Sequence, residues 1–135
     1  MSAAKRSGGG GPPRAARVGE RIREELASMI SLELRDPRLA GVAVTEVSMT
    51  PDLQLARVRV RLATIAPALE GDPARRKAML DALERASGTL RREIGQRLGL
   101  RFAPKLAFHY DESPEAKDRI DRLLDEIAKE PKARD

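Results

Sequence analysis

The chain has 135 residues, which suits one domain, and its apolar residues are mostly aliphatic, with two Phe, one Tyr and no Trp. It has no cysteine and one histidine, which argues against disulfides and against thiolate or histidine metal sites, so we expect no cofactor. No segment approaches the roughly 20 apolar residues that span a bilayer, and the first residues lack the apolar centre of a signal peptide. We expect a cytoplasmic monomer without a membrane partner.

Charge is unevenly distributed along the chain. The formal net charge is +5. Residues 1–110 hold 20 Lys and Arg against 12 Asp and Glu, whereas residues 111–135 hold 6 against 9. A basic body with an acidic C-terminal end predicts a polyanionic partner such as nucleic acid. The alternative at this stage is an ordinary solvated surface on a charge-rich protein.

The N-terminal third predicts an arm followed by a helix. Residues 1–14 combine a Gly8–Gly11 run, two prolines and basic side chains, a composition typical of a disordered basic arm. From Arg17 apolar residues recur at spacing four, which predicts a helix that ends at Asp36-Pro37 because proline disfavours the helical conformation in the preceding residue. The apolar positions are Val18, Ile22, Leu26, Ile30 and Leu34.

Two strands are predicted next, joined by the turn residues Pro51-Asp52. The first begins after Gly41, and its apolar residues change phase between Val44 and Val47, so we expect a bulge near Thr45-Glu46. The second alternates strictly from position 56 to 62, with three arginines on the face opposite its apolar residues. The pair predicts an antiparallel hairpin with one buried face.

The C-terminal half predicts helix, strand and helix. After a loop at 66–72, an apolar stripe from Met79 to Leu98 predicts the longest helix, which is capped by Gly99. Alternation at 106, 108 and 110 predicts a third strand, and Ser113-Pro114-Glu115 starts a last helix. The order indicates an α+β domain over residues 15–128, with helices packed on one face of a three-stranded sheet. Residues 129–135 form a short tail.

The centre of the long helix reads RASGTLRR, from Arg85 to Arg92, and contains its weakest helix formers. Because the apolar stripe continues in register through this step, we expect a kink at Ala86-Ser87-Gly88. A kink would free backbone N–H groups that favour an anion. The alternative is that Gly88 only permits close packing against another element.

Catalysis has little support in the sequence. The strand residues His109 and Asp111 could form half of a general-base pair, which leaves a small hydrolase as an alternative. However, the chain has no Cys, no serine in a G-x-S-x-G context and no phosphate-binding G-x-x-x-x-G-K-[ST] loop. We expect a protein that is not an enzyme, with His109 on a strand surface.

Basic residues recur on several predicted elements, as expected for contacts with RNA phosphates. Few aromatics argue against stacking of single strands on an aromatic sheet face and favour recognition of structured RNA by backbone and shape. The best candidates surround the kink, the second set lies on a strand, and the third opens the long helix. They are Arg85, Ala86, Ser87, Gly88, Arg91 and Arg92; Arg57, Arg59 and Arg61; and Arg75, Arg76 and Lys77.

Five segments stand out in their order and spacing: ELRDPRL, VTEVSMTPDLQLARVRV, ALERASGTLRREIGQRL, GLRFAPKLAFHYDES and IDRLLDEI. Together they resemble the ribosome-binding factor A (RbfA) family over roughly residues 17–127. The resemblance implies a type II KH-like fold in which Ala86-Ser87-Gly88 forms a helix-kink-helix in place of the G-x-x-G loop of ordinary KH domains.

The resemblance also implies a function. The family binds 16S rRNA of the immature small (30S) ribosomal subunit and promotes its late maturation, including rRNA 5′-end processing and cold adaptation, with release assisted by an assembly GTPase. A general KH-like RNA- or DNA-binding protein that is not dedicated to ribosomes is the alternative. The Gly- and Pro-rich arm and short tail of this chain depart from the family, so contacts made by termini elsewhere in it are not transferred.

Overall fold

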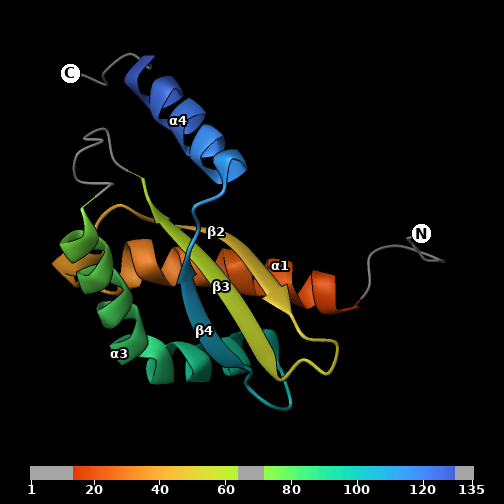
Figure 1. Cartoon of the computed structure of the whole chain (residues 1–135). Coiled ribbons are helices and arrows are strands. Elements are labelled where there is room, and N and C mark those ends of the chain that lie inside the picture. Colours follow the sequence, from red (N-terminus) through yellow and green to blue (C-terminus); the bar gives the residue numbers. More distant parts are fainter. Residues whose placement is uncertain (1–13, 64–71, 130–135) are drawn as a thin grey trace.

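The computed structural model of the chain describes residues 14–63 and 72–129. Except for Arg14, the predicted arm lies outside these residues, as do most of the predicted 66–72 loop and most of the tail. The described elements follow the predicted order of helix, two strands, long helix, strand and helix (Figure 1). They are α1 (Arg14–Ser28), β2 (Val42–Met49), β3 (Leu55–Leu62), α3 (Pro73–Leu98), β4 (Lys105–Tyr110) and α4 (Pro114–Lys129).

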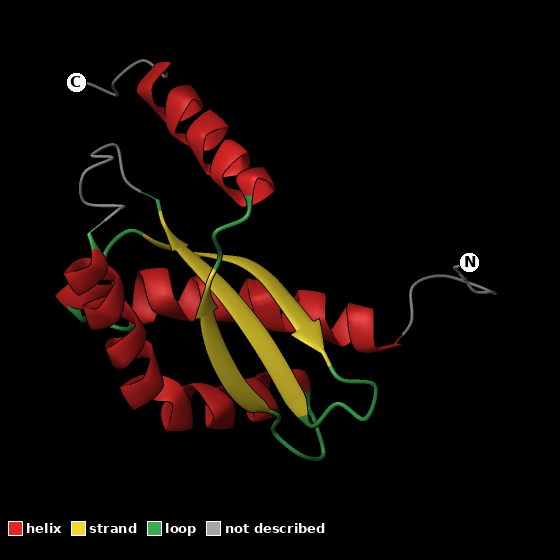
Figure 2. Cartoon of the chain, in the orientation of Figure 1, coloured by secondary structure: helices red, strands yellow, loops and turns green. Residues whose placement is uncertain are grey.

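The sheet has the strand order β2-β3-β4, with β2 and β3 antiparallel and β3 and β4 parallel (Figure 2). Val58 of the central strand pairs with Val47 on one side and Phe108 on the other. The register of the hairpin shifts between Val44 and Glu46. This shift confirms the predicted bulge, which lets both apolar phases of β2 face the core.

The core lies between one face of the sheet and two helices. Figure 1 shows α1 and the second half of α3 behind the strands, while the other sheet face is left open by these helices. Aliphatic side chains fill the space between them, as the composition predicted. They include Ile22 and Leu26 from α1, Val58 and Val60 from β3, and Leu83, Leu90 and Ile94 from α3.

The first helix ends differently from the prediction. Regular α-helix stops at Ser28, and a π-helical turn, η1 (Met29–Glu33), follows before the chain extends at Leu34. The π turn closes with a hydrogen bond from the Leu34 N–H to the Met29 carbonyl oxygen at 2.8 Å. Asp36-Pro37 instead opens a 3₁₀ turn, η2 (Pro37–Leu39), where the Asp36 carboxylate accepts from the Arg38 N–H.

The predicted caps at the end of α3 and the start of α4 are present, and α3 also has an N-cap, Asp72, that was not predicted. The Asp72 side chain accepts a hydrogen bond from the Ala74 N–H at the start of α3, and Gly99 ends that helix in the left-handed conformation with φ of 63°. Ser113 caps α4 by accepting from the Ala116 N–H at 3.1 Å. The Asp72 and Ser113 side chains thus satisfy N–H groups that the first turn of a helix leaves without an intrahelical partner.

The helix α4 extends away from the sheet rather than covering it (Figure 1). Its apolar face is buried only at the start, where Ala116 and Ile120 lie, while Leu123 and Ile127 are about 50% and 55% exposed. The shared core of the domain is therefore built by α1, α3, the π and 3₁₀ turns and the sheet.

Candidate nucleic-acid interface

The long helix α3 is continuous from Pro73 to Leu98, but Figure 1 shows a clear bend in its middle part. The Ser87 hydroxyl donates a hydrogen bond to the Glu84 carbonyl oxygen at 2.7 Å. Such bonds from a serine to the preceding turn often bend helices. The helical backbone continues through Ala86-Ser87-Gly88, so the structure does not show the freed N–H groups that we expected of a kink at this step.

Gly88 faces open space. A Cβ built on Gly88 would meet no atom within 4 Å beyond its chain neighbours and the backbone of its own helix, and the backbone here is ordinary right-handed helix. Packing against another element in the described part of the chain therefore does not explain a glycine here. Ala86, two residues earlier, is partly buried and packs against the core, whereas Gly88 is exposed.

Arg85 and Arg92 lie on the same face of α3 as Gly88, because residues three and four apart are neighbours on a helix. Both arginines are exposed. Among the described residues, no hydrogen bond or ion pair holds either guanidinium. The charge of Arg85 also helps to lower the pKa of Asp36 and of Asp81. The bend therefore carries two exposed cations, one on either side of a glycine whose backbone no side chain covers.

Arg91 has a different role from its neighbour. Its Nε donates to the Pro104 carbonyl oxygen and its guanidinium NH2 group to the Ala103 carbonyl oxygen, both at 3.0 Å. A Cβ on Gly95 would lie 3.3 Å from that of Ala103, so the loop packs tightly on α3. Arg91 thus fastens the α3–β4 loop to the helix.

The basic residues that open α3 are also engaged. Arg75 donates to the carbonyl oxygens of Arg38 and Ala40, at 2.9 Å each, and so ties α3 to the η2 turn. Arg76 lies 4.0 Å from the centroid of the Tyr110 ring and forms an ion pair with Glu112 at 3.4 Å. Lys77 pairs with Asp81 one turn along the helix, at 2.8 Å.

The expected row of arginines on β3 is only partly exposed. Arg57 is exposed, and Arg59 forms an ion pair with Glu46 across the hairpin at 3.2 Å. Arg61 is buried, at 5% exposure, and donates to the backbone oxygen of Asp111 at 2.7 Å. The prediction that Arg61 lies on the surface is therefore wrong. Alternation placed its side chain on the open face of β3, but the segment after β4 covers it.

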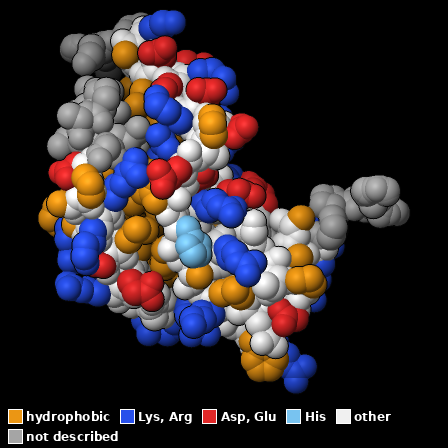
Figure 3. All heavy atoms as spheres, in the orientation of Figure 1, with side chains coloured by type: hydrophobic (Ala, Val, Ile, Leu, Met, Phe, Trp, Pro, Cys, Tyr) orange, Lys and Arg blue, Asp and Glu red, His pale blue; other side chains and the backbone are white. Residues whose placement is uncertain are grey.

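His109 lies on the open sheet face, with basic side chains around it in Figure 3. It does not form the catalytic pair considered from the sequence. The buried Asp111 carboxylate instead accepts from the Thr45 hydroxyl and from the Ser113 N–H. Burial raises the pKa of Asp111, but these hydrogen bonds outweigh it and hold that pKa below its usual value. Asp111 therefore serves as a structural tie.

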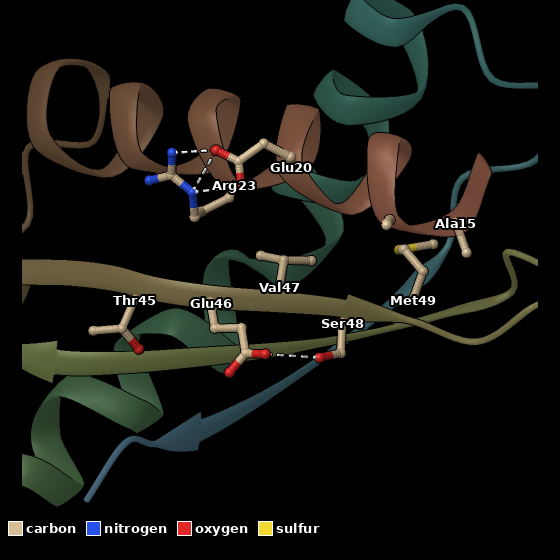
Figure 4. A pocket seen from close by; sticks show the side chains of 9 residues that line it. Ala15, Glu20, Arg23, Thr45, Glu46, Val47, Ser48 and Met49 are labelled. Carbon is tan, nitrogen blue, oxygen red and sulfur yellow. Dashed lines mark hydrogen bonds and ion pairs between the residues drawn. The ribbon is translucent and has the colours of Figure 1, made fainter. Parts of the chain in front are cut away.

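A hollow of about 530 Å³ lies between α1 and the outer strand β2 (Figure 4). Arg23 is the single cation that lines it among the described residues, and its guanidinium is paired with Glu20 at 2.5 Å. Glu46, on the opposite wall, accepts from Ser48 and pairs with Arg59. With its one cation neutralised and two carboxylates present, the hollow is not suited to a phosphate.

Sequence reasoning missed a second cluster, centred on Arg97. This guanidinium bonds Glu33 at 2.6 Å, Glu93 at 3.2 Å and Glu25 at 3.3 Å, and so joins α1, the π turn and α3. These bonds, chiefly that to Glu33, raise the pKa of Arg97. The i,i+4 spacing of Glu93 and Arg97 was readable in the sequence, but the other two partners come from distant segments.

Residues 14–63 and 72–129 offer neither a metal site nor a membrane-spanning helix. No cluster of three or more His, Cys, Asp or Glu side chains there is placed to hold a metal ion. No helix in the same ranges has both the length and the apolar composition needed to cross a bilayer.

Comparisons with known proteins agree with this architecture. The model of the ribosome-binding factor A family matches residues 14–124. Ribosome-binding factor A of Sorangium cellulosum (strain So ce56) is 51% identical over 114 residues, which cover 84% of this chain and 88% of that protein.

Solved structures of ribosome-binding factor A proteins share this fold. The crystal structure of ribosome-binding factor A from Thermus thermophilus matches with a TM-score of 0.57 and 26% identity, over 71% of this chain and 94% of that one. A Thermotoga maritima protein assigned to the same kind, solved by NMR, matches with a TM-score of 0.61 and 32% identity, over 79% and 96%. A homology model of the Thermus thermophilus factor, fitted into a cryo-EM map of its complex with the 30S subunit, matches with a TM-score of 0.55 and 26% identity, over 70% and 92%. The chain belongs to the ribosome-binding factor A family.

Proposed function

We propose that this protein binds 16S rRNA in the immature small ribosomal subunit, through the exposed face of the α3 bend. Family membership supports a ribosomal partner, and the 30S complex fitted for the Thermus thermophilus relative supports the small subunit. The observation that carries the site is the arrangement of Arg85 and Arg92 on either side of Gly88, with both side chains exposed and neither held by a hydrogen bond or ion pair among the described residues. The domain at residues 15–128 acts as a monomer and needs no cofactor.

The chemistry of this face suits a phosphodiester backbone. A guanidinium presents a planar fork of donors that matches two phosphate oxygens. At Gly88 the missing side chain lets a ribose-phosphate chain approach the helix closely, while the two arginines reach phosphates on either side. Arg57, exposed on the open sheet face, is a secondary contact in this proposal, and the buried Arg61 is not one.

The cellular role that we propose is assistance with late maturation of the small subunit, including rRNA 5′-end processing and growth in the cold, with release by an assembly GTPase. Deletion of the gene should cause precursor rRNA and free small subunits to accumulate, most strongly at low temperature. Sucrose-gradient profiles and mapping of rRNA ends measure this outcome. A normal profile with normal rRNA ends in the cold would reject the role.

The site itself is tested by reversing two charges. Arg85→Glu with Arg92→Glu should weaken binding to immature small subunits and lower the slope of log affinity against log salt by about 2, because two phosphate contacts are lost. The matched control is Arg119→Glu with Arg122→Glu, which makes the same charge change at exposed positions of α4. If both double variants weaken binding equally, the effect is general charge and the α3 face is not the site.

A general RNA- or DNA-binding protein is separated from an assembly factor by its choice of partner. We expect immature small subunits to be bound more tightly than naked 16S rRNA fragments or duplex DNA at the same salt concentration. Equal affinity for all three would favour the general binder.

A further inference from the structure

The α3–β4 loop carries an aromatic ring that the core does not use. Phe102 is 73% exposed, whereas the other two aromatic side chains of the sequence, Phe108 and Tyr110, pack against the core. The guanidinium carbon of Arg101 lies 5.6 Å from the centroid of the Phe102 ring. An exposed ring beside an arginine is the pair of groups on which unpaired RNA bases stack.

The loop that presents Phe102 is held firmly on both sides. Arg91 bonds the two carbonyl oxygens at positions 103 and 104, and Pro104 is buried. The Leu100 N–H donates to the Gly95 carbonyl oxygen at 3.0 Å. The Lys105 N–H donates to the backbone carbonyl oxygen of Gln54, in the hairpin loop, at 2.9 Å. The exposed ring therefore stands on a fixed support, and little entropy is lost when a ligand orders it.

The neighbouring hairpin loop is also fixed. Leu53 has a φ of 63°, in the left-handed region that costs a branched side chain energy. Its N–H donates to the Thr50 carbonyl oxygen at 2.9 Å, while the Asp52 carboxylate accepts from Thr50 and from the Gln54 N–H. These contacts hold Leu53 in its strained conformation beside the α3–β4 loop.

The two loops and the start of α1 enclose a hollow of about 340 Å³, within the range of roughly 300–1,000 Å³ typical of small-ligand sites. Leucines supply an apolar wall, Gln54 offers an amide to a base edge, and two arginines face a single carboxylate, that of Asp52. The principal lining residues are Arg14, Leu53, Gln54, Leu100, Arg101 and Phe102.

We propose that this hollow receives one unpaired nucleotide of RNA, whose base stacks on Phe102 while Arg101 and Arg14 neutralise its phosphate. The inference rests on the proposed rRNA binding and adds a second contact to it. The excess of cations over carboxylates favours a nucleotide over an apolar protein segment. Arg91 fastens this loop to α3, the helix that carries Arg85 and Arg92. One structured RNA that presents an unpaired base next to a double helix could therefore contact both the hollow and these two arginines.

The first test compares ring removal with ring retention. Phe102→Ala should reduce affinity for immature small subunits about five- to hundredfold, as removal of one stacked base contact does, while Phe102→Trp should retain it. The control is Leu32→Ala, which removes an equally exposed apolar side chain, at 75% exposure, from the π turn. Unchanged affinity of Phe102→Ala would overturn the proposal, as would an equal loss in Leu32→Ala.

The second test identifies what touches the ring. The sequence has no tryptophan, so Phe102→Trp carries a single tryptophan, whose emission reports on the loop. At low salt, oligoadenylate should quench its emission, and a blunt RNA duplex with the same number of phosphates should not. If Phe102→Ala weakens subunit binding but oligoadenylate leaves the emission unchanged, the ring contacts a ribosomal protein and base stacking is overturned.

Failure of the underlying function has a different signature. In that case wild-type protein would not bind immature subunits at any salt concentration, whatever the residue at position 102. Retained wild-type binding with an insensitive Phe102→Ala rejects only the stacking contact.

Discussion

Gly19 of α1 lies so close to Val47 of β2 that a Cβ built on the glycine would stand 2.8 Å from the valine carbonyl oxygen. The helix can approach the outer strand this closely only because position 19 has no side chain. Gly88, at the bend of α3, has no such neighbour and faces open space. The same substitution should therefore have opposite effects at the two positions.

Gly19→Ala should destabilise the protein by about 1–3 kcal/mol, because the added carbon meets a backbone atom that cannot rotate away. Gly88→Ala should stabilise it by up to about 1 kcal/mol, because alanine is the better helix former and nothing opposes it. Thermal unfolding measures both, since about 1 kcal/mol shifts the Tm of a domain of this size by roughly 4 °C. Shifts of the same sign in the two variants would contradict the assigned packing.

Elements and caps were predictable here because they depend on local patterns. The phase change between Val44 and Val47 predicted the bulge, and Ser113 predicted the start of α4. The burial of Arg61 was not predictable, because it depends on Asp111, 50 residues away, which parallel pairing of β3 with β4 brings into reach. Alternation shows which side chains share a face, but not whether a distant segment covers that face.

The candidate site was partly predictable for the same reason. Helical spacing places Arg85, Gly88 and Arg92 together, and the structure adds that their surface is open. Arg91 could not be distinguished from Arg92 in the sequence, because the loop that it fastens is positioned by the tertiary fold. Which of two neighbouring arginines is free for a ligand is decided by contacts that no local pattern encodes.

Arg91 and Arg92 should therefore respond differently to removal of charge. Arg91→Gln should lower the free energy of unfolding by about 1–3 kcal/mol, because two charge-assisted hydrogen bonds to the loop are lost. Arg92→Gln should leave stability nearly unchanged and weaken subunit binding. Paired denaturation and binding measurements separate the two roles, and equal stability loss in both variants would reject the distinction.

Asp36 should contribute to a decline in stability in acid. Hydrogen bonds from the Arg38 side chain and N–H lower its pKa from 3.8 to about 2. A carboxylate whose pKa is lowered by folding stabilises the protein above its unfolded pKa, and that contribution is lost as pH falls from about 4 through about 2. Asp36→Asn can keep the backbone cap but does not titrate.

The test is therefore the pH dependence of the difference between wild type and Asp36→Asn. The wild type should have the higher Tm at pH 7, and the difference should shrink as the pH is lowered through this window. A difference that stays constant from pH 7 to pH 2 would show that the Asp36 carboxylate is not held in its charged form by Arg38.

Thr45 should contribute through Asp111. Its hydroxyl donates to the buried carboxylate, so Thr45→Val leaves an acceptor without that donor and should cost about 1–3 kcal/mol at neutral pH. Because the bond helps to keep the pKa of Asp111 low, the penalty should diminish in acid as the carboxylate is protonated. Thr45→Ser, which keeps the hydroxyl, is the control and should show no penalty that depends on pH. A loss in Thr45→Val that does not diminish in acid would show that the bond to the Asp111 carboxylate is not its cause.

Because the surface at Gly88 is open, we expect a larger side chain at this position to change the affinity for RNA and not the stability of the fold. Gly88→Gln introduces a neutral, helix-favouring side chain at an exposed position where even a Cβ would meet no other element, so the unfolding transition should be unchanged or slightly higher. If RNA approaches the bend as proposed, the same side chain stands between the backbone and the phosphates, and affinity for immature subunits should fall. Ala128→Gln, at an exposed position of α4, is the matched control and should bind normally. Normal binding by Gly88→Gln, with its stability retained, would mean that the bend sets the direction of α3 without touching RNA.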